Sequence, residues 1–291
     1  MAVGAWGGAN GEIATEWRKH AECPFPWKPC VNSAGVLGTV AKGEGGGLFV
    51  SFDAFGGRRA YMKPTKKALP MYAKAAREKI ASDLAFEVGV AVPPVMLATR
   101  DRPPMGEERH VCVSLVMFQR QWSWFEVKGW VSDTATTEAA QLIKSKVPAA
   151  ASRAFAFDTW LDQTDHGGEC TRGAFEGHNH NIIFGYDATS AGEGSFVFLD
   201  YAYSLGAGER WKHGGASNCV PANFPHRMLK LLDKQALAET VQRIEDTPSS
   251  AVEGVLSRIP VTHLEPEFSR EIQEGLLSRR SLVRKALADY L

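Results

Sequence analysis

A small set of polar side chains, spread between residues 63 and 200, has the types needed to handle a nucleoside triphosphate. Phosphoryl transfer needs a cation against the phosphates, oxygen ligands for magnesium, and a group that orients the attacking hydroxyl. The sequence offers candidates for every role, in the order Lys63, Glu78, Asp165, Asn179 or Asn181, and Asp200. The chemistry that this set would support is transfer of a phosphoryl group from ATP, with Mg²⁺, to a hydroxyl.

Two of these candidates belong to neighbouring elements. Lys63 ends a predicted strand shortly after a glycine-rich turn at residues 43–47, so a rigid element could carry its ammonium to phosphates. Glu78 lies on the next predicted helix, in a strip of small residues that would let the helix approach a sheet and meet Lys63. A surface lysine and a solvated glutamate are the ordinary alternatives. The basic residues around Lys63 could also attract phosphate groups, with a solvated helix face as the alternative interpretation: Lys66, Lys67, Lys74, Arg77 and Lys79.

Asp165 begins a loop in the segment WLDQTDH, directly after a predicted amphipathic helix. A carboxylate on a loop beside a rigid helix is well placed to orient a hydroxyl. Asp158 and Asp162 precede it on the helix itself, and we interpret them as helix caps or surface charges.

The candidate magnesium ligands stand beside two short apolar runs. Asn179 and Asn181 lie in HNHNIIF, just before a predicted strand, where either amide oxygen could bind the ion and where turn formation is the alternative. Asp200 follows the apolar run FVFL. A charge at the end of a buried strand is costly unless a cation or polar partners compensate it, so metal binding is favoured over a turn-capping role.

The elements that must position these residues predict an α+β chain with two lobes and a cleft between them. We expect an N-lobe over residues 1–118, with an irregular N-terminal arm, a small antiparallel sheet and one helix that ends at Gly89. Residues 119–291 are expected to form a helical C-lobe. The main elements expected are strands at 47–52, 59–63, 110–118, 182–184 and 196–199, and helices at 71–88, 138–147 and 149–162.

Four segments together resemble the HipA-like kinases and, more distantly, the phosphatidylinositol kinases. They are KIASDLAFEVGVAVPPV, AFDTWLDQTDH, HNHNIIF and FLDYAYSL, and the similarity extends over roughly residues 60–205. The resemblance implies a two-lobed protein-kinase-like fold and an ATP-dependent phosphotransferase. Its partners would be ATP and a hydroxyl-bearing acceptor, with serine or threonine of a protein expected before a lipid or small molecule.

The same resemblance implies a role for each candidate. Lys63 would contact the α- and β-phosphates and Glu78 would pair with it, while Asp165 would be the catalytic aspartate and Asp200 a magnesium ligand. The second ligand would be Asn179 by the HipA-like pattern or Asn181 by the lipid-kinase pattern. The segment facing adenine would consist of Val116, Met117, Phe118 and Gln119.

Two departures from the pattern keep alternatives open. Relatives carry arginine after the catalytic aspartate where this chain has His166, and the insertion GGECTRGAFEGH lengthens the loop before the asparagines. A nucleotide-binding pseudokinase scaffold is therefore one alternative. Another is a metal site in the 166–180 loop, which contains His166, Cys170, His178 and His180.

Bulk properties narrow the setting. Lysine plus arginine equals aspartate plus glutamate, 33 each, so no excess charge suggests nucleic acid as a partner. No apolar stretch is long enough to cross a bilayer, and the first residues do not have the pattern of a signal peptide. The five cysteines are odd in number and irregularly spaced, which favours free thiols and a cytoplasmic location.

Overall fold

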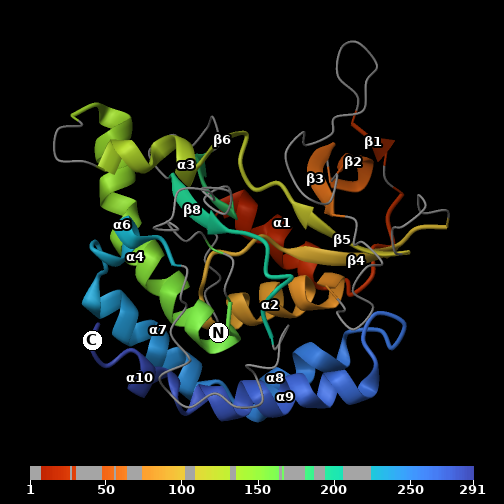
Figure 1. Cartoon of the computed structure of the whole chain (residues 1–291). Coiled ribbons are helices and arrows are strands. Elements are labelled where there is room, and N and C mark those ends of the chain that lie inside the picture. Colours follow the sequence, from red (N-terminus) through yellow and green to blue (C-terminus); the bar gives the residue numbers. More distant parts are fainter. Residues whose placement is uncertain are drawn as a thin grey trace, which may run out of the picture.

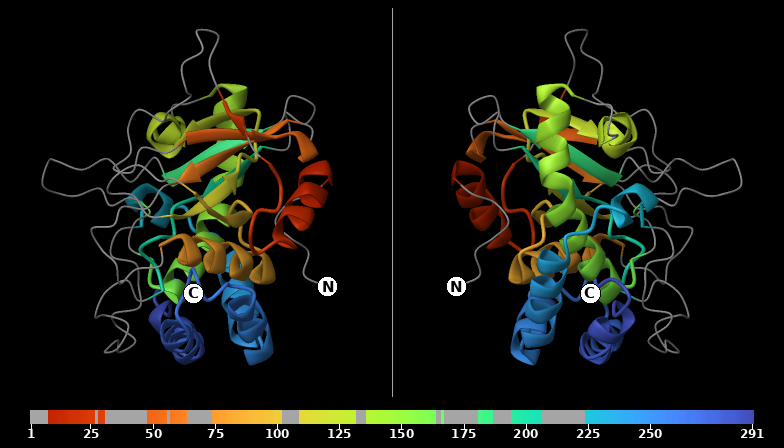
Figure 2. Two further views of the ribbon diagram at one scale, coloured as in Figure 1. Left: turned by 90° about the vertical axis from the view of Figure 1, so that its right-hand side faces the viewer. Right: turned by 90° about the vertical axis from the view of Figure 1, so that its left-hand side faces the viewer.

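The structure is a computed structural model of the chain. It describes residues 8–26, 28–30, 48–55, 57–63, 74–101, 109–131, 136–163, 166, 181–186, 194–205 and 224–291. Figures 1 and 2 show strands and the N-terminal helix at one end of the molecule, and the C-terminal helices gathered at the other. The mixed α+β character predicted from the sequence is confirmed.

An antiparallel sheet of five strands, in the order β1-β2-β3-β5-β4, forms the first part. In β2 and β3, alternate residues are buried, as expected of strands with one face on a core. The buried set Val50, Phe52, Ala60 and Met62 lies on that face. The strands are β1 (Lys28–Pro29), β2 (Leu48–Phe52), β3 (Arg58–Lys63), β4 (Val95–Thr99) and β5 (His110–Leu115), with a 3-10 turn η1 (Asp53–Phe55).

The helix α2 (Lys74–Val88) packs between this sheet and the C-terminal helices, and Gly89 ends it at φ 77°. The helix predicted here is confirmed. The interpretation of its basic residues as a solvated face is wrong for two of them, since Arg77 and Lys79 are buried. Because the helix has protein on both sides, it buries nearly all of its circumference.

A helix also stands where we expected an irregular arm. The helix α1 (Gly8–Arg18) lies against the sheet (Figures 1 and 2) and places Ala14 and Trp17, three residues apart, on one buried face. The Trp17 ring meets that of Phe52 edge-on at 5.1 Å between centroids. Burial of this face outweighs the poor helix propensity of the glycines in the segment.

A second antiparallel sheet has three strands in the order β6-β7-β8. The predicted strands at 182–184 and 196–199 correspond to β7 (Ile182–Tyr186) and β8 (Ser195–Phe198). The strand β6 (Arg120–Ser123) was not predicted, because its exposed Arg-Gln start lacks the apolar alternation of a strand. It runs into the short helix α3 (Trp124–Val127) and the 3-10 turn η2 (Lys128–Val131).

One long helix, α4 (Glu138–Leu161), replaces the two helices expected on either side of Pro148. Proline removes one backbone hydrogen bond, but the i, i+4 series Ile143, Val147, Ala151 and Phe155 is buried without interruption. The continuous apolar face therefore holds the helix together across the proline. The helices that follow are α6 (His226–Leu229), α7 (Lys234–Asp246), α8 (Ser249–Ser257), α9 (Pro266–Arg280) and α10 (Val283–Ala286).

Among the helices that the structure describes, none combines the length and the apolar character required to cross a membrane.

Candidate active site

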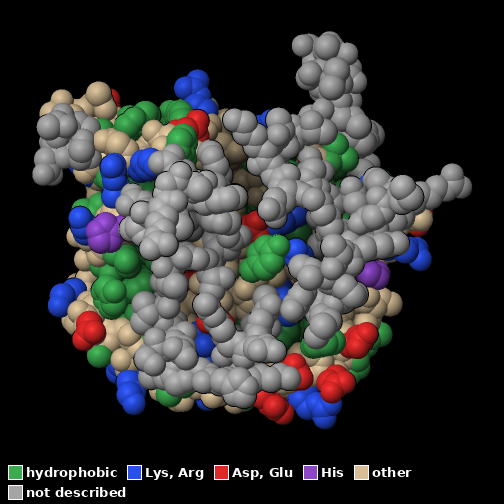
Figure 3. All heavy atoms as spheres, viewed as in Figure 1, with side chains coloured by type: hydrophobic (Ala, Val, Ile, Leu, Met, Phe, Trp, Pro, Cys, Tyr) green, Lys and Arg blue, Asp and Glu red, His purple; other side chains and the backbone are tan. Residues whose placement is uncertain are grey.

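Lys63, Glu78 and Asp200 come together although they are far apart in the sequence. The Lys63 ammonium donates to Glu78 Oε1 at 3.0 Å and also contacts Asp200 Oδ1 at hydrogen-bond distance. The three residues come from the end of β3, from α2 and from the turn after β8. The structure thus brings together three of the candidate residues, whereas Asp165 lies outside the described residues. On the face seen in Figure 3, acidic and basic side chains lie together near the middle of the molecule beside a hydrophobic patch.

Backbone contacts fix both carboxylates. Glu78 Oε2 accepts a hydrogen bond from the backbone N–H of Tyr201 at 2.9 Å, so Glu78 links Lys63 to the residue after Asp200. Asp200 has a φ of 62°, the left-handed region that residues other than glycine rarely occupy. Its carbonyl accepts from Gln163 Nε2 at 2.7 Å. Such a conformation costs roughly 1–3 kcal/mol and is concentrated at functional sites.

Charge compensation within this trio shifts the pKa of each member. Burial disfavours the Lys63 ammonium, but Asp200 and Glu78 outweigh that effect and raise the pKa of Lys63 well above its usual value. Burial raises the pKa of Glu78 and Lys63 offsets only part of it. Burial would also raise the pKa of Asp200, but the positive charge of Lys63 has the larger effect and lowers the pKa of the Asp200 carboxyl. Lys63 and Asp200 therefore face each other as ions, with side chains 24% and 26% exposed.

Beneath the trio lies a buried network that the sequence analysis did not foresee. Asp158 is wholly buried rather than a cap or surface charge, and its carboxylate contacts His166 Nδ1 at 2.5 Å and the Tyr201 hydroxyl at 3.1 Å. The run AFAFDTWL around Asp158 carried a usable signal, since a charge among apolar neighbours is expected to be buried and paired. Asp162, by contrast, does cap the helix, at φ 57°.

His166 is tied on both ring nitrogens. Nε2 lies 2.7 Å from the carbonyl oxygen of Leu199, which can only accept, so that nitrogen carries a proton. The short contact from Nδ1 to Asp158 requires a further proton between them, and Tyr201 donates its hydroxyl proton to the other carboxylate oxygen. The Asp158–His166 pair is thus neutral overall and connects α4 to the backbone just before Asp200.

Several predicted site residues lie outside the described part of the chain or contribute through their backbone. Asp165 and Asn179 are outside it, as are Cys170, His178 and His180 of the alternative metal site. Asn181 directly precedes β7, and its carbonyl accepts from the Leu199 N–H at 2.7 Å, which brings it beside the Asp200 turn. Across the described residues, no group of three or more His, Cys, Asp or Glu side chains is arranged to hold a metal.

The segment expected to face adenine links the two sheets. The Val116 N–H donates to the Arg59 carbonyl at 3.0 Å, so that amide is engaged within the sheet. Met117 and Phe118 are buried in the core of the five-stranded sheet. Phe118 packs against β7 at Gly185, where a Cβ would lie 2.3 Å from its ring. The Met117 and Phe118 side chains therefore serve packing, while the exposed Gln119 leads into β6.

Comparison with known proteins defines the fold. No family model and no curated protein sequence matches this chain. Among solved structures, the Helicobacter pylori proinflammatory kinase CtkA superposes with a TM-score of 0.57 at 13% identity, over 90% of this chain and 98% of that one. The Golgi casein kinase gives 0.51 at 10% identity, over 99% and 78%. Its form with Mn/ADP bound gives 0.50 at 9% identity, over 99% and 79%. The chain has a protein-kinase-like fold, as predicted.

Proposed function

We propose that this protein is an ATP-dependent phosphotransferase that moves the γ-phosphate of ATP to a hydroxyl. The observation that carries the proposal is the contact of the Lys63 ammonium with both Glu78 and Asp200. In a kinase-like fold, a lysine held by a helix glutamate and facing a carboxylate from a later turn suits a polyphosphate ligand. The Golgi casein kinase, which shares the fold, has been crystallised with Mn/ADP.

The residues present fit a magnesium ion. The Asp200 carboxylate and the amide of Asn179 or Asn181 are hard oxygen donors, and Mg²⁺ in nucleotide sites needs only one or two protein ligands beside phosphates and water. Asp200 is kept ionised by Lys63 and held in a left-handed turn, which suits an oxygen donor aimed at one point. When bound, the ion would neutralise charge on the phosphates.

Other residues of the chain would bind the phosphates, the acceptor hydroxyl and adenine. Lys63 would bind phosphate oxygens while Glu78 keeps its ammonium extended, and Asp165 would orient the acceptor hydroxyl. The segment Val116–Gln119 would face adenine through its backbone, near a boundary between the lobes at about residue 118. We further propose that the protein is a HipA-like kinase, that its acceptor is a serine or threonine of a protein, and that it acts in the cytoplasm. Cys23, Cys30 and Cys112 carry free thiols, as a reducing compartment would require.

A nucleotide-binding scaffold without transfer is the second candidate. It is favoured by His166, which occupies the position of the arginine in the family pattern but is tied inward to Asp158 and Leu199. Its ring therefore does not offer a cation to phosphate or substrate beside Asp165.

The test is incubation with Mg²⁺ and γ-labelled ATP, followed by detection of label on the protein or on lysate components. Wild type should transfer label, and Asp200→Ala should reduce transfer to background because a magnesium ligand is removed. Asp289→Ala, a change at an exposed C-terminal position, should behave as wild type. Binding of ATP by wild type without any transfer would favour the scaffold, and no nucleotide binding at all would refute both candidates.

Asp165→Ala separates the two candidates further. For an enzyme, this change should abolish transfer while ATP binding is kept, since the residue would act on the acceptor hydroxyl and not on the nucleotide. Unchanged transfer in this variant would contradict the role assigned to Asp165.

A further inference from the structure

The C-terminal end of α1 contacts two different parts of the molecule through adjacent residues. Trp17 enters the core of the five-stranded sheet, where its ring meets Phe52 and Phe55 at 5.1 and 5.0 Å between centroids. Arg18 points instead to α2 and is 6% exposed. One short segment of α1 thus joins the sheet that carries Lys63 to the helix that carries Glu78.

Arg18 holds α2 and the connection that follows it by several contacts. Its guanidinium donates to the backbone carbonyl of Ser82 in α2 and, at 3.2 Å, to that of Val92 before β4. It also lies over the Phe86 ring, 4.7 Å from the centroid. Hydrogen bonds from a charged donor to buried carbonyls are among the stronger ones in proteins. These contacts therefore restrain both the axis of α2 and its exit towards β4.

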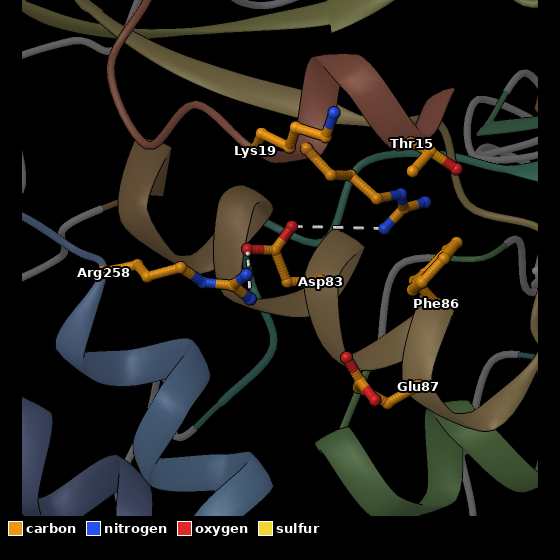
Figure 4. Close-up of a pocket in the computed structure, with 7 residues that line it drawn as sticks. Thr15, Lys19, Asp83, Phe86, Glu87 and Arg258 are labelled. Carbon is orange, nitrogen blue, oxygen red and sulfur yellow. Dashed lines mark ion pairs between the residues drawn. The ribbon is translucent and has the colours of Figure 1, made fainter. Parts of the chain in front are cut away.

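The same face of α2 contains an ion cluster around Asp83. Lys79 donates to the Asp83 carboxylate at 2.9 Å, Arg258, the residue after α8, pairs with it at 3.1 Å, and Arg18 lies 4.0 Å away. Figure 4 shows Arg258, at the C-terminal end of α8, meeting Asp83 of α2, with Thr15 of α1 and Lys19, the residue after α1, above them. Burial lowers the pKa of Arg18 to about 10, although Asp83 opposes this effect, so the guanidinium remains charged at neutral pH.

Arg18 is also one residue away from the contact that holds the Asp200 turn. Its acceptor Val92 follows Ala91, whose carbonyl accepts from the Phe198 N–H at 3.0 Å. Phe198 ends β8, two residues before Asp200. The arginine thus restrains both the helix that carries Glu78 and the connection that supports the Asp200 turn.

We infer that Arg18 is a positioning residue of the site: by fixing α2 against the five-stranded sheet, it keeps Glu78 in contact with Lys63. The N-terminal helix α1 therefore helps to position the site residues through Arg18. This inference deepens the proposed phosphotransferase function, but the arrangement it describes can be tested without nucleotide.

Cys112 provides a local probe of that arrangement. It pairs with Lys63 in the register of β3 and β5 and is buried in the cluster that includes the apolar residues of α2. A thiol reagent can reach it when α2 moves away from the sheet or when the protein unfolds. Cys30, which is half-buried at the far edge of the sheet beside β1, serves as an internal reference.

The experiment compares rates of thiol alkylation under native conditions, read peptide by peptide by mass spectrometry. The Arg18→Met variant keeps an apolar stem over Phe86 but loses the donors. We expect Cys112 to react about tenfold faster or more, with Cys30 unchanged, because the cost of local opening falls with the lost hydrogen bonds. Lys19→Met is the matched control, since Lys19 is exposed and pairs only with Glu16 among the described residues; it should leave both rates unchanged.

A second control separates positioning from general stability. Leu276→Ala removes core contacts of α9 and none of the contacts of Arg18, so it lowers stability without freeing α2. If Cys112 reacts no faster in Arg18→Met than in Leu276→Ala of equal or lower stability, the inference is overturned. If Arg18→Met does not fold, Arg18→Lys is used; it keeps the charge but not the two-pronged donor, and should accelerate Cys112 less.

Activity gives an independent second readout. Where wild type transfers phosphate, Arg18→Met should raise KM for ATP and lower kcat together, by about tenfold or more in kcat/KM, as expected of misplaced binding groups. An unchanged kcat/KM beside a faster Cys112 reaction would overturn the positioning role. Failure of wild type to bind nucleotide would refute the proposed function and leave the alkylation result to decide the arrangement of α2.

Discussion

At the scale of single residues, two aspartates, Asp200 and Asp158, differ in exposure and in the direction of their pKa shifts. Asp200 is a quarter exposed, contacts the Lys63 ammonium, and has a lowered pKa. Asp158 is wholly buried, and burial raises the pKa of its carboxyl although His166 opposes the effect. The first is suited to hold cations, and the second to fix the backbone that carries the first. Different environments thus give one residue type two roles.

The role of Asp158 can be tested by Asp158→Asn. An amide keeps the shape but cannot share the proton of the short contact with His166 Nδ1, so a strong hydrogen bond between two buried groups is weakened. We expect the free energy of unfolding to fall by about 3 kcal/mol, as when one partner of a buried pair is removed. Urea denaturation measures this. Asp289→Asn, at an exposed position, should change stability by less than about 0.5 kcal/mol.

The meeting of Lys63, Glu78 and Asp200 could be anticipated because each residue type fits one need of a polyphosphate ligand. The Asp158–His166–Tyr201 network could not, because its contacts join residues whose proximity depends on the path of the chain between α4 and β8. Sequence spacing gives no measure of that path. Only the apolar surroundings of Asp158 were visible beforehand, and they indicate burial without naming a partner.

At the scale of elements, the segment between β5 and β6 depends on a close contact with β7. Phe118 occupies the space where a side chain at Gly185 would stand, and the Arg120 carbonyl lies 2.7 Å from that Cβ position. Backbone cannot move aside as a flexible side chain would. The absence of a side chain at Gly185 is therefore what allows the linking segment to lie on β7.

Gly185→Ala should destabilise the protein by about 2 kcal/mol, the usual cost of overpacking a filled space. Because the linking segment is the one proposed to face adenine, nucleotide affinity should fall as well. Thermal unfolding with and without ATP and Mg²⁺ measures both effects. Gly254→Ala in α8 is the matched control, since nothing lies within 4 Å of its Cβ position, and helix propensity predicts a gain of about 0.5–1 kcal/mol. Equal losses in the two variants would contradict the packing argument.

Elements with clear local signals were predicted well: α2 from apolar residues at helical spacing before Gly89, and β2, β3 and β5 from apolar stretches next to turn residues. The errors have two physical sources. For α1 and α4, tertiary burial of one face overrode the local signals of glycine and Pro148. For β6, strand formation depends on pairing with β7, more than fifty residues later, and such pairing leaves little trace in a four-residue segment.

At the scale of the whole molecule, two histidines join the sheet to the C-terminal helices. His110 begins β5, and His263 lies between α8 and α9, with ring centroids 4.2 Å apart. Glu22 Oε1 lies 3.8 Å from His263 Nδ1. Burial, together with His110, lowers the pKa of His263 to about 4. The folded protein thus keeps His263 neutral under conditions in which an unfolded chain would protonate it.

This contact predicts acid sensitivity. Between pH 6.5 and about 4 the unfolded state binds the extra proton and the folded state does not, so stability is full above that range and falls as the pH drops through it. The loss assigned to His263 is about 3 kcal/mol. Unfolding by urea at pH 7 and pH 4.5 should therefore show a smaller drop for His263→Gln than for wild type. His226→Gln, at an exposed position, should show the same drop in the free energy of unfolding as wild type. An equal drop between pH 7 and pH 4.5 in all three proteins would refute the assignment to His263.

For the proposed phosphotransferase, the charges of Lys63, Glu78 and Asp200 bear on the order in which metal and nucleotide would bind. One ammonium and two carboxylates within contact leave a surplus of one negative charge, and a bare triphosphate approaching them would be repelled. A nucleotide that arrives already chelated to a divalent ion brings the missing positive charge with it. Charge balance thus favours binding of the metal–nucleotide complex as one unit. Metal-free ATP is expected to compete only weakly with that complex for the site.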